Sequence, residues 1–138
     1  MRRRAERERE REQAAADAEM RVATRLLLEE LDTIALHHAL VAKATIYPRN
    51  PPQFPTAVWE RYKTTFAGRL DDETWQALAT FMHTVPQVRT ALAEAQTMST
   101  IDPSMEERLR DGALLARDLH ATLSGTPAPS VNEKGEPE

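Results

Sequence analysis

The stretch from residue 14 to residue 44 constrains the fold most, because it contains neither glycine nor proline. Its apolar residues recur at spacings of three, four and seven, which is the periodicity of one face of an α-helix. The stripe consists of Met20, Leu27, Leu31, Ile34, His38 and Val41, and Leu28, Ala35 and Ala42 widen it. We therefore expect a long N-terminal helix over about residues 5–45. Pro48 ends it, because the residue before a proline avoids helical geometry.

Two shorter amphipathic helices are expected after a proline-rich segment around residues 47–55. Thr56 is a suitable N-cap for a helix over residues 57–68, and Asp71 is one for the helix that follows. Pro86 either ends this second helix or kinks it, because proline cannot donate the backbone hydrogen bond that a helix interior needs.

The C-terminal part predicts two more helices. One covers about residues 86–98, and the other begins at Asp102 and Pro103, since proline is favoured at the first helical position. The last helix runs to about Leu123. Residues 125–138 are polar and hold too few apolar side chains to offset the entropy of ordering them.

These patterns predict an all-α protein in which a long N-terminal helix packs on a small bundle of about four shorter helices. The expected organisation is a charged helical extension over residues 1–19, a helical bundle domain over residues 20–124, and a disordered tail over residues 125–138. Trp59 and Trp75 each begin an apolar helix face, and we expect this aromatic stripe to be core rather than a ligand-binding wall.

Composition excludes several classes of site. There is no cysteine, which rules out disulfides and Cys-ligated metals. The formal net charge of -4 argues against binding of nucleic acid by the whole domain. No apolar run approaches the roughly 20 residues of a membrane span, and no apolar segment of a secretory signal follows the basic N-terminus. The expected location is therefore the cytoplasm.

Candidate catalytic and metal-binding residues are few. A site built from histidines of the first, third and last helices is conceivable, but the motifs of helical metal sites, such as Glu-x-x-His, are missing. The acidic clusters read as solvated faces and helix N-termini. We assign no catalytic, cofactor-binding or metal-binding residue, and expect a protein that is not an enzyme and needs no cofactor. The four histidines are His37, His38, His83 and His120.

The first twelve residues are dominated by Arg and Glu, which alternate from Glu6 onward. Opposite charges at i,i+3 and like charges at i,i+4 oppose one another, so this segment is expected to be a solvated extension of the first helix. Residues 14–26 are expected to extend beyond the bundle and to carry a weak coiled-coil seam for a protein partner or for self-association. The seam consists of Ala16, Met20, Ala23 and Leu27.

Three segments together resemble a group of small helical proteins of unknown function from high-GC, actinobacteria-like genomes. They are RLLLEEL (Arg25 to Leu31), PTAVWERY (Pro55 to Tyr62) and LDDETWQAL (Leu70 to Leu78). Members of the group often carry an N-terminal membrane helix followed by an Arg/Glu-rich helix. The resemblance implies that Arg2, Arg3 and Arg4 form a juxtamembrane cluster that can meet a membrane surface. This chain lacks the membrane helix, so it is expected to be either a soluble variant or a fragment, and as a fragment without its N-terminal anchor it would belong to a membrane-associated protein.

The function expected first is a non-enzymatic helical interaction or oligomerisation module. The first alternative is a membrane-proximal regulatory or sensing domain, which liposome co-sedimentation would reveal. The second alternative is a histidine-dependent metal-binding protein, which metal analysis of the purified protein would reveal.

Overall fold

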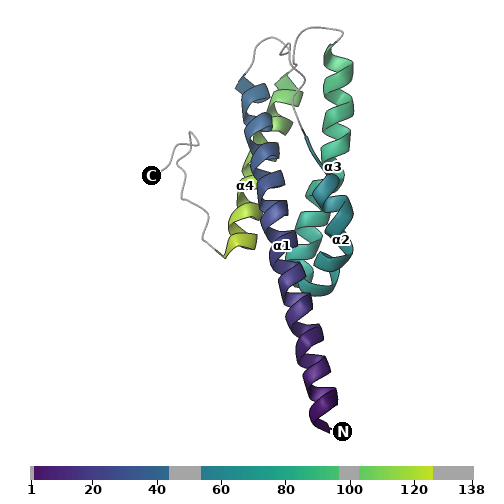
Figure 1. Ribbon diagram of the computed structural model, residues 1–138. Coiled ribbons are helices and arrows are strands. Elements are labelled where there is room, and N and C mark those ends of the chain that lie inside the picture. Colours follow the sequence, from purple (N-terminus) through teal and green to yellow (C-terminus); the bar gives the residue numbers. More distant parts are fainter. Residues whose placement is uncertain (1, 44–53, 97–102, 126–138) are drawn as a thin grey trace.

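Four helices account for almost all of the residues described by the computed structural model, which are residues 2–43, 54–96 and 103–125 (Figure 1). The helices are α1 (Arg2–Lys43), α2 (Ala57–Arg69), α3 (Asp72–Gln96) and α4 (Pro103–Ser124). The predicted all-α fold, with a long N-terminal helix packed on shorter ones, is confirmed. The predicted disordered tail lies almost entirely outside the described residues, as does most of the proline-rich segment.

Helix α1 organises the molecule. It has 42 residues and is therefore about 63 Å long at a rise of about 1.5 Å per residue. Helices α4 and α2 both run antiparallel to α1 and pack directly on it, whereas α3 packs on α4 and α2 (Figure 1). Residues 3–15 are exposed and project beyond the bundle as a free helical arm (Figure 1).

The expectation of about four shorter helices needs one correction, because α3 continues through Pro86 and only three shorter helices are present among the described residues. Proline in a helix interior costs about 3 kcal/mol, chiefly through a lost hydrogen bond and a steric clash. Pro86 itself faces solvent. Continuing the helix past it keeps Val85, Val88 and Leu92 on one buried face. Burial of these side chains offsets the cost of the proline.

The core lies where the apolar stripe of α1 meets the other three helices. Every stripe residue from Leu27 to Val41 is buried, as the periodicity predicts. Trp59 of α2 is buried and Trp75 of α3 is partly buried, with their ring centroids 5.3 Å apart. Trp59 belongs to the hydrophobic core cluster and Trp75 packs against that cluster, so the prediction that the aromatic stripe is core is confirmed for Trp59 and only in part for Trp75.

The bundle reaches further down α1 than the sequence predicts. Arg69, at the end of α2, forms an ion pair with Asp17. The hydroxyl of Thr65 donates a hydrogen bond of 3.3 Å to Glu19. The prediction that residues 14–26 extend beyond the bundle is therefore wrong from Ala16 onward, because α2 runs back along this part of α1 and covers it.

Candidate interaction surface

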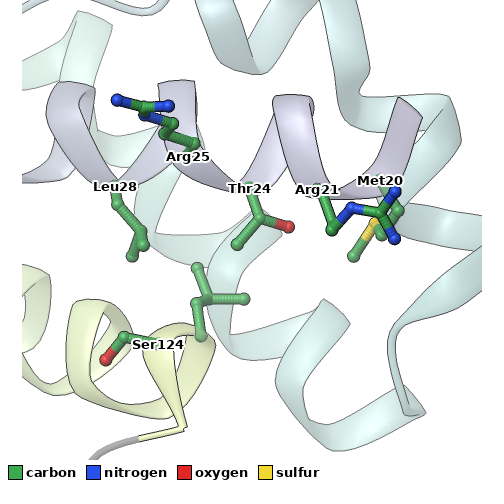
Figure 2. A pocket seen from close by; sticks show the side chains of 7 residues that line it. Met20, Arg21, Thr24, Arg25, Leu28 and Ser124 are labelled. Atoms are coloured by element: carbon green, nitrogen blue, oxygen red, sulfur yellow. The ribbon is translucent and has the colours of Figure 1, made fainter. Parts of the chain in front are cut away.

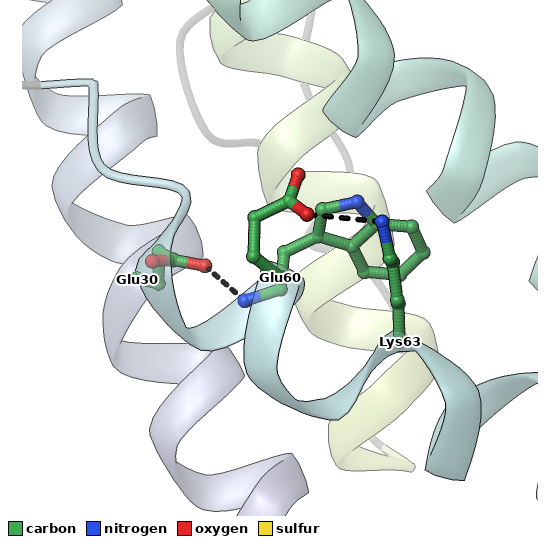
Figure 3. A network of polar contacts seen from close by, with 4 residues as sticks. Glu30, Glu60 and Lys63 are labelled. Atoms are coloured by element: carbon green, nitrogen blue, oxygen red, sulfur yellow. Dashed lines mark hydrogen bonds and ion pairs between the residues drawn. The ribbon is translucent and has the colours of Figure 1, made fainter.

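Two buried polar side chains on α1 are the natural first candidates for a functional site, and they are Glu30 and His38. Glu30 as a residue is 5% exposed. Its Oε1 accepts a hydrogen bond from the backbone N–H of Val58 and its Oε2 accepts one from that of Trp59, each at 3.0 Å. Figure 3 shows the carboxylate aimed at the start of α2.

Glu30 therefore caps the N-terminus of α2, a role that the sequence predicts for Thr56. The first N–H groups of a helix lack partners within the helix, and an N-cap side chain usually supplies them. The Thr56 side chain makes no capping hydrogen bond among the described residues. A carboxylate from α1 caps α2 instead and also complements the positive end of the helix dipole. Burial raises the pKa of Glu30, while the two backbone hydrogen bonds lower it less strongly. We assign Glu30 to the docking of α2 on α1.

His38 belongs to α1 and is 1% exposed. Its ring packs against α4 and against the aromatic rings of Phe54 and Phe81. Its Nδ1 is 2.8 Å from the backbone carbonyl oxygen of Ile34. Because a carbonyl oxygen only accepts, Nδ1 carries the proton, and in the neutral ring Nε2 holds the lone pair. Burial lowers the pKa of His38, which favours this neutral form.

A small cavity of about 170 Å³ adjoins the imidazole between α3 and α4. His38, Phe81, Val88 and Gly112 line it, with Arg108 and Asp111 also contributing. The glycine lets α4 approach the imidazole closely. This arrangement explains how a histidine is accommodated in the core. The cavity is smaller than the roughly 300 Å³ at which ordinary ligand pockets begin.

The histidines that the alternative metal site would need are not brought together. His38 is buried, His83 is exposed on α3, and Nε2 of His120 on α4 lies 3.3 Å from Oδ1 of Asp32. His37 is half-buried and lies near Phe54, with their ring centroids 6.4 Å apart. Within the part of the chain that the structure describes, no three histidine or acidic side chains are placed to share a metal ion.

The predicted interaction seam is divided by the fold. Ala23 and Leu27 are fully buried in the core, so the prediction that they are open to a partner is wrong. Ala16 is half-buried and Met20 packs partly against the core. The stripe that resembles a coiled-coil seam is the same stripe that the bundle needs, and α2 reaches far enough down α1 to cover it.

A different face of α1 is open. Leu36 and Leu40 lie one turn apart and are each 56% exposed, and Val22 is exposed further down the helix. We call Leu36 and Leu40 the outer leucines. At about 100° per residue they lie roughly opposite the core stripe of Leu27 and Ile34. Two large apolar residues at i,i+4 off the core stripe are the signal in the sequence that could have identified this face.

A groove of about 370 Å³ lies between α1 and the end of α4. Its apolar surface comes from Met20, Leu28 and Leu123. Arg21 and Arg25 flank it, but Figure 2 shows the guanidinium group of Arg25 directed away from α4 rather than into the groove. Thr24 and Ser124 also line the groove, but their hydroxyl groups point in opposite directions in Figure 2. The polar groups therefore do not converge on one point, as they do in a small-molecule site.

The arginine cluster expected at a membrane surface lies at the far end of the arm, where Arg3 and Arg4 are exposed. None of the described helices is long and apolar enough to cross a membrane. Comparison of the chain with protein-family models, with curated protein sequences and with solved structures finds no match in any of the three.

Proposed function

We propose that the chain is a non-enzymatic helical interaction module that self-associates through the outer face of α1. The observation that carries the proposal is the exposure of Leu36 and Leu40, one turn apart on a helix that the bundle holds rigidly from its other side. Isolated exposed leucines are normal on protein surfaces. An i,i+4 pair on one helix face is instead the pattern with which helices dock on one another.

The exposed area sets the strength of the association. Full burial of a leucine side chain stabilises by about 1.5–3 kcal/mol, and about half of each outer leucine is already covered by the chain itself. Association also costs translational and rotational freedom and orders side chains at the interface. We therefore expect a weak, concentration-dependent dimer rather than an obligate one.

The free arm has no apolar face to contribute. Glu and Arg alternate from Glu6 to Glu12, and residues 3–15 are exposed. Opposite charges at i,i+3 support the helix without creating a seam. We expect the arm to act as a charged helical spacer, and the dimer to form without it.

Sedimentation velocity of the intact chain over a concentration series tests the proposal. We expect the weight-average sedimentation coefficient to rise with concentration, and Leu36→Gln with Leu40→Gln to abolish the rise. Leu114→Gln, which removes an exposed leucine from α4, is the matched control and should leave the rise intact.

Two results would contradict the proposal. One is a wild-type chain that stays monomeric at every concentration. The other is loss of association on removal of residues 1–14 with the outer leucines unchanged, which would assign the association to the arm.

A further inference from the structure

We infer that the partner on the outer face of α1 is a second copy of the chain in antiparallel orientation, with the twofold axis passing between Leu36 and Leu40. The inference rests on the proposed self-association. It adds the orientation, the register and the charges that specify them.

The outer leucines are bracketed by opposite charges. Asp32 lies one turn before Leu36, and Lys43 lies about one turn after Leu40. At about 100° per residue, these four side chains fall within an arc of about 80° on one face of α1. All four are exposed. Asp32 contacts His120 at 3.3 Å, but its side chain remains 69% exposed and open to a second partner.

Along α1 this face begins with an acid and ends with a base. It therefore matches the same face of a second copy only when the two helices run antiparallel. With the axis between the leucines, Leu36 meets the partner's Leu40, and the symmetry repeats the contact. Asp32 then lies within one residue of the level of the partner's Lys43, which gives two pairs of opposite charge per dimer. Such an interface, in which the same patch is used by both copies, is the normal form of a twofold dimer.

The parallel alternative brings like charges together. Aligning the leucines in a parallel pair places Asp32 opposite the partner's Asp32 and Lys43 opposite the partner's Lys43. Juxtaposed like charges suppress an arrangement even where opposite charges contribute little to its affinity. The charges therefore select the orientation, and the leucines supply the contact area.

One neighbouring acid provides an internal control for the register. Glu29 is exposed on α1 nearly one turn before Asp32. In the inferred register it lies beyond the end of the paired segment, with no lysine of the partner level with it. Shifting the axis to Leu36 would instead pair Glu29 with the partner's Lys43 and leave Asp32 opposite a leucine. The two acids therefore distinguish the two registers.

The decisive experiment is a charge reversal with complementation, measured by sedimentation velocity on the full chain. Asp32→Lys alone and Lys43→Asp alone each turn both attractive contacts into repulsive ones, and each should weaken dimerisation roughly tenfold. An equimolar mixture of the two variants restores opposite charges at both contacts, so heterodimers should form with nearly wild-type affinity. Glu29→Lys makes the same change in charge on the same helix and should leave the dissociation constant nearly unchanged.

Circular dichroism melts of each variant establish that it is folded. The neutral variants Asp32→Asn and Lys43→Gln provide a second test. Each should weaken dimerisation less than the charge reversals do, and mixing the two variants should not restore the wild-type affinity.

If the wild-type chain associates but the single reversals do not weaken its dimerisation, or the mixture of reversed variants does not recover the wild-type affinity, the inferred register is wrong while the proposed self-association stands. The inferred register would also be wrong if Glu29→Lys weakened dimerisation and Asp32→Lys did not. A wild-type chain that is monomeric at every concentration would remove the proposed function and this inference with it.

Discussion

A Cβ atom on residue 112 would lie 2.5 Å from Cδ2 and 2.8 Å from Nε2 of His38, so Gly112 of α4 leaves the space that the imidazole of α1 occupies. Helices α1 and α4 form the most extensive contact of the bundle. The pair joins a residue near the C-terminal end of one helix to the middle of the other. We therefore expect the addition of one methyl group at this contact to change the free energy of unfolding of the whole protein.

Gly112→Ala is expected to destabilise the protein. The added methyl group would overlap a buried ring, and overpacking of this kind costs about 1–3 kcal/mol. The better helix propensity of alanine returns only about 1 kcal/mol. Chemical denaturation should therefore show a net loss of stability, and combining the change with His38→Ala should recover part of it, because the overlap disappears.

Gly68→Ala is the matched control for this prediction. Gly68 lies in α2, and a Cβ built on it meets nothing within 4 Å. The same substitution should stabilise the protein here by about 0.5–1 kcal/mol, since a helical alanine loses less entropy on folding. Equal effects at both glycines would show that the contact between Gly112 and His38 is not tight.

The stability of the fold should depend on the protonation of His38. Burial lowers the pKa of this imidazole below its ordinary value of 6.5, so the folded state binds fewer protons than the unfolded state as pH falls. The stabilising contribution is therefore complete above pH 6.5 and is lost as pH falls from 6.5 toward the folded-state pKa. The slope approaches about 1.4 kcal/mol per pH unit for one proton.

Denaturation of the wild type and of His38→Gln on both sides of pH 6.5 measures this dependence. The free energy of unfolding of the wild type should drop more steeply with acidification than that of the variant. His83→Gln, at an exposed site on α3, should behave as the wild type does. Parallel profiles for all three proteins would contradict the prediction.

Removing the Glu30 cap should cost more than removing Thr56. In Glu30→Gln one oxygen still accepts, but the amide NH₂ faces a buried backbone N–H, and an unsatisfied group of this kind costs about 1–3 kcal/mol. Thr56→Ala should have little effect, because the threonine side chain makes no capping hydrogen bond. Urea denaturation of both variants checks the order, and a larger loss in Thr56→Ala would show that α2 is capped locally.

The two indoles should differ in their contribution to stability. Trp59 is 7% exposed, whereas Trp75 is only partly buried at the edge of the same cluster. Trp59→Ala should therefore cost about 3–5 kcal/mol, as is usual for a buried aromatic residue, and Trp75→Ala should cost distinctly less. Thermal melts of the two variants check this order, and an unchanged melt for Trp59→Ala would show that the stripe is not core.

Local chemistry in the sequence was sufficient for most of the secondary structure. The periodicity of α1, the start of α4 at Pro103 and its stop before Gly125, which has φ of 74°, follow from rules that act within a few residues. The core stripe from Leu27 to Val41 was predictable for the same reason. Pro86 was the exception, because its local cost is weighed against burial of side chains further along α3.

The placement of polar groups and of open faces was decided by the tertiary structure. The cap of α2 comes from Glu30, far earlier in the sequence, and the space for His38 comes from Gly112. Nothing in the sequence near either residue indicates which distant residue it will contact. Ala23 and Leu27 show the same limit, since whether an apolar stripe is core or seam depends on how far α2 reaches along α1. Periodicity identifies the face that needs a partner, but only packing over the whole chain determines which face is left without one.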